Sequence, residues 1–209
     1  NNVYRLPLKN KQGTGWQAIW DTGGIDRIDA RKAKVSVSID LRNATLDQSD
    51  HAGGYISSAK GIYGGFTIAH DWNGISLGKT ADLCVIENAT GGRSGDRLIG
   101  NGASNRLVGR AGADVLYGGQ GGKDVLIGGA GKDQFWIDVN PESFAIVNDF
   151  KIGQDKLVFD VKKSLLSYVR GRDSLVVEYD NSPVAKLLGV DVPLFSLNEN
   201  IVFNGFSGL

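Results

Sequence analysis

In the middle of the chain a large apolar residue recurs about every ninth position, and the positions between are rich in glycine and aspartate. Five consecutive segments share this pattern, and the fourth has one extra residue: 91–99, 100–108, 109–117, 118–127 and 128–136. The pattern predicts a six-residue turn followed by a three-residue strand in each segment. The middle residue of each strand is predicted to point inward, and these residues are Leu98, Leu107, Leu116, Leu126 and Phe135.

The segments follow the consensus G-G-x-G-x-D-x-U-x, with U a large apolar residue, which is the nonapeptide pattern of calcium-binding parallel β-structures. Glycine lets the turn pass through positive φ at low cost, and the lack of bulky side chains lets carbonyls point at a cation. Aspartate at position six adds a charged oxygen, which suits Ca²⁺ and its six to eight oxygen ligands. A flexible glycine-rich linker would not repeat an apolar residue in this way. We therefore predict an all-β fold with a parallel β-roll that binds several Ca²⁺ ions.

Two segments make one coil of such a roll, so every second turn lies on the same edge, about 4.8 Å from the next. One edge, called the aspartate edge below, carries Asp96, Asp114 and Asp133, and two ions fit between its three turns. The other, called the asparagine edge, has Asn105 in place of aspartate and an extra residue that is expected to displace Asp124. We predict tighter Ca²⁺ binding on the aspartate edge.

Short apolar runs outside the repeats predict further strands. They lie at 17–20, 34–41, 144–150, 156–159, 174–179 and 184–190. Residues 46–82 are expected to form glycine- and serine-rich loops with short apolar runs such as 65–69, and 83–89 leads into the roll. Asn181-Ser182-Pro183 predicts a hairpin between the last two runs. Because a roll has two open ends that need caps, we expect an N-terminal flanking β region over 1–86, the roll over 87–136 and a C-terminal β cap over 137–209. The flanking strands are expected to be antiparallel, and the C-terminal region is also the candidate for a secretion signal.

Composition narrows the function. The 209 residues include 23 basic and 23 acidic ones, and this zero net charge gives no reason to expect a nucleic-acid partner. No apolar stretch is long enough to span a bilayer. Cys84 is the one cysteine and is predicted to be buried in its apolar run, and the absence of methionine predicts a fragment or a processed product. Basic side chains inside the repeats should lower the affinity for Ca²⁺, and these are Arg93, Arg97, Arg106, Arg110, Lys123 and Lys132.

Four motifs outside the strict repeats carry a resemblance. They are AIWDTGGIDRIDA (18–30), FTIAHDW (66–72), VIENATGG (85–92) and VNDFKIGQDKLVF (147–159). In this order, and together with the nonapeptides, they resemble the C-terminal calcium-binding β-roll (RTX) domain of serralysin-type secreted metalloproteases, over about residues 3–203. The resemblance implies a secreted, extracellular protein that folds on Ca²⁺, with a type I secretion machinery and an upstream catalytic domain as its partners.

The resemblance also implies a set of calcium ligands. In the roll these fall at positions two, four and six of one turn and at positions one, three and six of the next turn on the same edge. On the aspartate edge the ligands are Gly92, Ser94, Asp96, Gly109, Arg110, Ala111, Gly112, Asp114, Gly128, Ala130 and Asp133, and on the asparagine edge they are Gly118, Gln120 and Asp124. An upstream calcium turn is implied at Asp21, Gly23, Gly24 and Asp26, with Glu87 closing a neighbouring site. The family's R-x-G-x-T loop, which gives this upstream turn further carbonyls, is not in the sequence.

The protease domain of that family binds zinc through H-E-x-x-H-x-x-G-x-x-H. The only histidines, His51 and His70, lie in no such motif, so this chain is predicted to be a non-catalytic module without catalytic residues. Two alternatives stay open. One is a module of a polysaccharide-active secreted enzyme of the alginate epimerase or lyase type, and the other is a stand-alone adhesion or surface protein. Sugar stacking in the first alternative would use Trp16, Trp20, Trp72 and Trp136.

Overall fold

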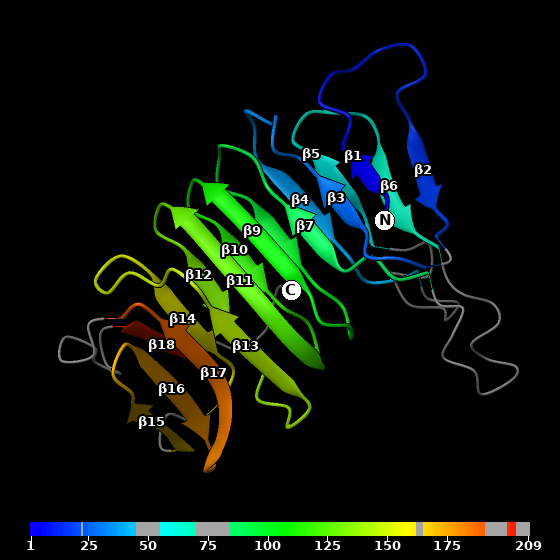
Figure 1. Ribbon diagram of the computed structural model, residues 1–209. Coiled ribbons are helices and arrows are strands. Elements are labelled where there is room, and N and C mark those ends of the chain that lie inside the picture. Colours follow the sequence, from blue (N-terminus) through cyan, green and yellow to red (C-terminus); the bar gives the residue numbers. More distant parts are fainter. Residues whose placement is uncertain (22, 45–54, 70–83, 162–164, 191–199, 204–209) are drawn as a thin grey trace, which may run out of the picture.

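The computed structural model describes residues 1–21, 23–44, 55–69, 84–161, 165–190 and 200–203. They form two nine-stranded sheets (Figure 1). The first sheet contains, in spatial order, β1 (Val3–Arg5), β3 (Arg27–Asp29), β7 (Asn88–Thr90), β9 (Arg106–Ala111), β11 (Gly122–Ala130), β13 (Ser143–Val147), β17 (Ser182–Leu188), β16 (Ser174–Tyr179) and β15 (Leu166–Arg170). The second contains β18 (Ile201–Phe203), β14 (Lys156–Phe159), β12 (Gln134–Trp136), β10 (Val115–Tyr117), β8 (Arg97–Ile99), β4 (Val37–Asp40), β5 (Ser57–Ala59), β6 (Gly65–Ile68) and β2 (Trp16–Ile19).

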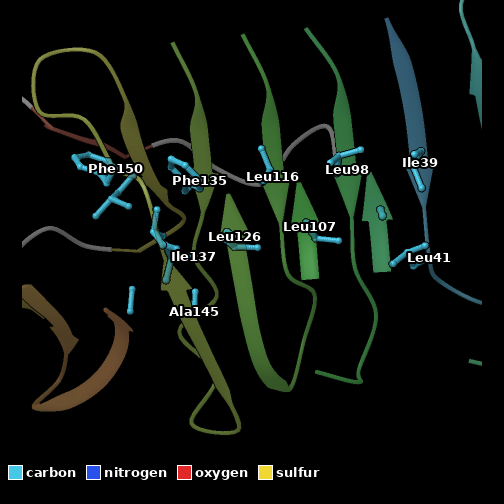
Figure 2. Close-up of a cluster of buried hydrophobic side chains, with 14 of the residues drawn as sticks. Ile39, Leu41, Leu98, Leu107, Leu116, Leu126, Phe135, Ile137, Ala145 and Phe150 are labelled. Carbon is cyan, nitrogen blue, oxygen red and sulfur yellow. The ribbon is translucent and has the colours of Figure 1, made fainter. Parts of the chain in front are cut away.

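The chain alternates between the two sheets through the repeats, so that β7 leads to β8, β9 to β10 and β11 to β12. In the second sheet Leu116 pairs in parallel register with Leu98 on one side and Phe135 on the other. In the first sheet Leu126 pairs with Leu107. All five side chains are fully buried and stack in rows along the interior, as Figure 2 shows. The predicted all-β fold with a parallel roll is confirmed.

Parallel pairing continues beyond the repeats on both sides. β3 and β4 precede the predicted roll and pair in parallel with β7 and β8. β13 and β14 follow it and pair in parallel with β11 and β12, and β17 and β18 continue the two stacks. The strands next to residues 87–136 are therefore parallel. Antiparallel pairs are found further out, at β4–β5–β6 and at β15–β16–β17.

The inward side chains explain this longer parallel region. Ile39 pairs with Leu98, and Leu157 pairs with Phe135, so both extend the same buried row. Parallel stacking needs this row and the backbone hydrogen bonds, whereas the glycine–aspartate consensus is required only where a turn binds an ion. The proposed division into three regions stays a prediction.

The hairpin predicted around Asn181 is present as β16–β17, and its turn passes through positive φ at Asp180 and Asn181. Cys84 is buried, as expected. Across the described residues, no helix has the length and apolar character needed to cross a membrane.

Candidate calcium sites

Position-six aspartates form a ladder along the aspartate edge. Oδ1 of each carboxylate accepts a hydrogen bond from the backbone N–H at the equivalent position of the preceding turn. The Val37 N–H donates to Asp96 (2.8 Å), the Asp96 N–H to Asp114 (2.7 Å), the Asp114 N–H to Asp133 (2.9 Å) and the Asp133 N–H to Asp155 (3.0 Å). All four aspartates are buried. The ladder therefore fixes one oxygen of each carboxylate and places a column of charge at this edge.

The second oxygens differ along the column. Oδ2 of Asp96 accepts a hydrogen bond from the Gly92 N–H (2.5 Å). Among the residues that the structure describes, Oδ2 of Asp114 and Oδ2 of Asp133 are buried without a hydrogen-bond partner. A buried polar atom without a partner destabilises a fold by about 1–3 kcal/mol, and by more when it is charged. A bound cation would satisfy both oxygens.

The glycines at position one leave room beside these carboxylates. A methyl carbon on Gly91 would stand 2.4 Å from Oδ2 of Asp96 and 2.8 Å from the carbonyl oxygen of Gly109. A methyl carbon on Gly109 would stand 2.3 Å from Oδ2 of Asp114 and 2.7 Å from the carbonyl oxygen of Gly128. Each gap between neighbouring turns is thus bordered by a carboxylate and by a carbonyl of the next turn. This all-oxygen donor set fits Ca²⁺.

Burial raises the pKa of Asp96, Asp114 and Asp133. Asp114 reaches a pKa of about 7, because desolvation outweighs its hydrogen bond from the Asp96 backbone and because the charges of Asp96 and Asp133 add to the shift. The ion-free column is therefore an unfavourable place for three ionised carboxylates. A divalent cation between them would favour the ionised forms.

On the asparagine edge, Asp124 keeps its place. Its side chain is 2% exposed, and Oδ1 accepts a hydrogen bond from the Asn105 N–H (2.9 Å), as in the aspartate ladder. Burial raises the pKa of Asp124 to about 7. The extra residue is absorbed at Gly121 and Gly122, whose φ angles of 96° and 76° are accessible to glycine. The expected displacement of Asp124 is not found.

The side-chain amide of Asn105 has hydrogen-bond partners within the protein and needs no ion. Its amide nitrogen donates to the carbonyl oxygen of Glu87 (2.9 Å) and to Oδ1 of Asn101 (3.0 Å), while its own Oδ1 accepts from the Asn101 N–H (2.8 Å). The gap next to Asp124 is bordered by the buried residue Gly118, whereas Gln120 is exposed. One carboxylate therefore serves this gap, which supports the predicted ranking of the two edges.

Backbone pairing extends into two turns of the aspartate edge. The Gly112 N–H donates to the Ala130 carbonyl oxygen (2.8 Å), and Ala111 lies opposite Ala130 in the ladder between β9 and β11. Arg110 adopts φ 86°, which is rare for a residue with a side chain. In the turn before, the Ser94 hydroxyl donates to the carbonyl oxygen of Lys34 (2.9 Å). The carbonyl oxygen of Ala130, one of the predicted ligands, thus already accepts a backbone hydrogen bond.

The upstream turn brings Asp21, Asp26 and Glu87 to one end of the roll. Oε2 of Glu87 accepts a hydrogen bond from the Asp26 N–H (2.7 Å). Asn2 bridges the aspartates, donating from its backbone to Asp26 and from its side chain to Asp21 (2.8 Å). The Tyr4 hydroxyl also donates to Asp21 (2.5 Å), and burial, with this hydrogen bond, raises the Tyr4 pKa to about 12. Protein donors therefore already contact both upstream aspartates.

The two predicted glycines of this turn lie beside its carboxylates. The Gly23 N–H donates to Oδ1 of Asp21 (3.1 Å). Gly24 has a φ of 122°, and a methyl carbon there would stand 3.2 Å from Oδ2 of Asp26. Within the described part of the chain, that Oδ2 is buried without a hydrogen-bond partner. Asp26 thus has an oxygen left for an ion.

Sequence reasoning missed Asp155, the fourth rung of the ladder. The signal was present, because Asp155 precedes the inward Leu157 by two residues, as each repeat aspartate precedes its own inward residue. Within the described residues, no three His, Cys, Asp or Glu side chains converge on one metal-binding point. The expected sites instead combine one or two carboxylates with backbone carbonyls.

The residues of the alternative functions are only partly described. His51, His70 and Trp72 lie outside the described residues. Trp16 on β2 and Trp136 on β12 are separated by five strands of the same sheet. These two tryptophans therefore do not belong to one sugar-stacking platform.

Comparison with known proteins agrees with the repeats. A family model described as the RTX calcium-binding nonapeptide repeat, in four copies, matches residues 90–122 and 120–136. No curated protein matches the chain. These residues therefore carry RTX calcium-binding repeats, and the repeats imply that the roll binds Ca²⁺.

Two solved structures illustrate the similarity. The extracellular lipase LipA from Serratia marcescens is 19% identical with a TM-score of 0.35, over 91% of this chain and 34% of the lipase. The AlgE6R3 subunit of the mannuronan C5-epimerase from Azotobacter vinelandii is 23% identical with a TM-score of 0.24, over 53% of this chain and 79% of that subunit. The chain thus spans about a third of the lipase.

Proposed function

We propose that this chain is a calcium-dependent folding module of a secreted protein: its roll folds when export delivers it to Ca²⁺-rich surroundings, and it supports type I secretion and folding of an attached enzyme. The observation that carries the proposal is the buried column of Asp96, Asp114 and Asp133. It stands beside glycine-lined gaps, and Oδ2 of Asp114 and of Asp133 lacks a hydrogen-bond partner among the described residues.

The driving force follows from the difference in Ca²⁺ concentration. A site with the affinity of extracellular modules, Kd about 0.1–1 mM, stabilises the folded state by about 0.6–1.8 kcal/mol at about 2 mM Ca²⁺. At the sub-micromolar concentrations of a cytosol the same site contributes almost nothing. Three such sites, namely the two inner gaps of the aspartate edge and the gap next to Asp124, add about 2–5 kcal/mol. This is comparable with the whole stability of a marginal domain. The folded fraction would therefore be small before export and would rise after it.

The attached enzyme is the finer part of the proposal. The motif WDTGGIDRID (20–29) and its companions support a serralysin-type metalloprotease. The reading frame upstream of Asn1 tests this part alone: it should encode H-E-x-x-H-x-x-G-x-x-H. A different catalytic domain there would refute the metalloprotease and leave the calcium-dependent module standing.

A calcium titration tests the module itself. EGTA should lower the thermal midpoint of the roll and weaken its circular-dichroism signal, and millimolar Ca²⁺ should restore both. Mg²⁺ should do so poorly, because it demands a smaller octahedral site. A gain of about 2–5 kcal/mol corresponds to a rise of roughly 4–20 °C in the thermal midpoint for a chain of this size. A spectrum and a midpoint that EGTA leaves unchanged would overturn the proposal.

A further inference from the structure

The turn 148–155 follows the turn 128–133 on the aspartate edge but is built differently. It keeps the position-six carboxylate as Asp155, while Lys-Ile-Gly-Gln replaces the glycine-rich residues before it. The Lys151 carbonyl oxygen accepts hydrogen bonds from the N–H groups of Gln154 (3.1 Å) and Asp155 (2.9 Å). This carbonyl is therefore used inside its own turn, unlike the carbonyls of Gly109 and Gly128, which border the two inner gaps.

Side chains of this turn reach the carbonyls of the turn before. The Lys151 ammonium donates to the carbonyl oxygen of Gly129, and the Gln154 amide donates to the carbonyl oxygen of Gly131. Gly129 and Gly131 stand at positions two and four of their turn. Carbonyls at these positions are the expected calcium ligands in the two inner gaps, so protein donors occupy their counterparts here.

Charge at this outer gap is arranged around the ammonium. Asp149 accepts hydrogen bonds from the N–H groups of Gly128 (2.9 Å) and Gly129 (2.7 Å), which places a carboxylate next to the carbonyl that Lys151 contacts. Burial raises the pKa of Asp133 and of Asp155, and the charge of Lys151 acts against that shift at both. The charge of this one ammonium group thus acts on two carboxylates, those of Asp133 and Asp155.

The glycine at position one shows the same contrast. A methyl carbon on Gly109 would meet the carbonyl oxygen of Gly128 at 2.7 Å, so the next turn offers an oxygen to that gap. A methyl carbon on Gly128 would have only atoms of Asp133 as its three nearest neighbours. Any carbonyl of the turn 148–155 therefore lies farther than 2.9 Å from this point, whereas the Gly128 carbonyl lies 2.7 Å from the equivalent point at Gly109.

The opposite end of the aspartate edge is closed in a similar way. There the turn 30–36 stacks on the turn 91–96. The Arg110 guanidinium donates to the carbonyl oxygen of Arg31 (2.6 Å), and the Arg93 N–H donates to the carbonyl oxygen of Ala33 (3.1 Å). At both ends, cationic side chains and N–H groups satisfy the carbonyls of the terminal turns.

We propose that Lys151 is the chain's own cation in the outer gap: its ammonium group takes the place of a third Ca²⁺ ion and ends the ion stack of the aspartate edge. This inference rests on the proposed function, because it assumes that the two inner gaps bind Ca²⁺. It sets the capacity of this edge at two ions. It also makes the contact between the turns 128–133 and 148–155 independent of the Ca²⁺ concentration.

Removing the ammonium tests the proposal. Lys151→Ala should bind one Ca²⁺ ion more per chain than the unchanged protein, measured by calorimetry and by metal analysis after dialysis. In EGTA its urea midpoint should fall, since Asp133 and Asp155 lose their counter-charge, and saturating Ca²⁺ should recover the loss. Lys132→Ala is the matched control, because Lys132 lies exposed in the turn 128–133 and no hydrogen bond or ion pair is described for its side chain. Lys151→Arg keeps the charge and should behave like the unchanged protein.

The results for the Lys151 variants decide whether the ammonium group replaces an ion. An unchanged number of ions in Lys151→Ala overturns the proposal, and so does a Lys151→Ala variant that stays unfolded in millimolar Ca²⁺. If Lys151→Arg also gains an ion, the charge of the side chain is not what excludes calcium. An unchanged protein that binds no Ca²⁺ would instead refute the proposed function, so the two failures can be told apart.

Discussion

Replacing Asp114 by asparagine should stabilise the ion-free protein and destabilise the calcium-loaded protein. Asparagine keeps the Oδ1 that accepts the Asp96 N–H, so the ladder is preserved. It removes a charge that burial opposes and that Asp96 and Asp133 repel. Without Ca²⁺, and above the Asp114 pKa of about 7, this removal favours folding. With Ca²⁺ the same removal takes a charged ligand from both inner gaps.

The magnitude follows from the position of Asp114 between two gaps. If each gap contributes about 0.6–1.8 kcal/mol at about 2 mM Ca²⁺, losing both removes about 1.2–3.6 kcal/mol of calcium-dependent stability. Asp124→Asn is the matched variant, because Asp124 is equally buried and accepts the equivalent backbone hydrogen bond from Asn105. It serves one gap and should remove about half as much.

The assay is urea unfolding of the unchanged protein and both variants at pH 8, each in EGTA and in 2 mM Ca²⁺. Compared with the unchanged protein, Asp114→Asn should have a higher urea midpoint in EGTA and a lower urea midpoint in Ca²⁺. A loss of the same size in both conditions would show that the carboxylate is structural and does not serve an ion. Equal calcium-dependent losses for Asp114→Asn and Asp124→Asn would refute the ranking of the two edges.

Two further outcomes are expected. The folded-state pKa of Asp114 and of Asp124 is raised to about 7, so the stability that they contribute in EGTA is present below pH 4 and is lost as the pH rises through 7. The urea midpoint in EGTA should therefore fall from pH 5 to pH 8, while the rise in midpoint that Ca²⁺ produces should grow. A urea midpoint in EGTA that does not change with pH contradicts this. Gly109→Ala should weaken Ca²⁺ binding in calorimetry, because its methyl carbon would stand 2.3 Å from Oδ2 of Asp114. Gly15→Ala is the control: its methyl carbon would have nothing within 4 Å, so the affinity for Ca²⁺ should stay unchanged. Equal affinities in the two variants would contradict a calcium-binding gap beside Gly109.

The nine-residue period was sufficient to predict the three-residue central strands of the second sheet, but not the length of β9 and β11, which continue into the turns for six and nine residues in all. Each repeat places one large apolar residue between a glycine–aspartate turn and the next, and the three-residue strands around Leu98 and Leu116 follow directly from it. The stacking of Asp96, Asp114 and Asp133 also follows from the period, because two segments make one coil. Local pattern and global fold agree in this part of the chain.

The flanking coils could not be predicted in the same way. Ile39 belongs to the same buried row as Leu98, yet the two residues are 59 positions apart and no repeat connects them. The extra residue at Gly121-Gly122 was also misjudged. A count of positions treats it as a shift of Asp124, whereas two glycines at positive φ absorb it inside the turn and β11 resumes its register with β9 at Val125.

Burial destabilises the ionised aspartate column when no cation is bound, and the same burial makes a bound cation strongly stabilising. An exposed carboxylate is ionised at neutral pH whether or not Ca²⁺ is present, so an ion adds little to its stability. Asp114 is fully buried, and its Oδ2 has no hydrogen-bond partner among the described residues, so its ionised form lacks a counter-charge within the ladder itself. Asn105 shows the other solution within the same roll, because its amide provides the hydrogen bonds from the protein and needs no ion. Because these two side chains, one charged and one neutral, stand at equivalent positions, we expect the turn of Asp114 to depend on Ca²⁺ for its stability more than the turn of Asn105.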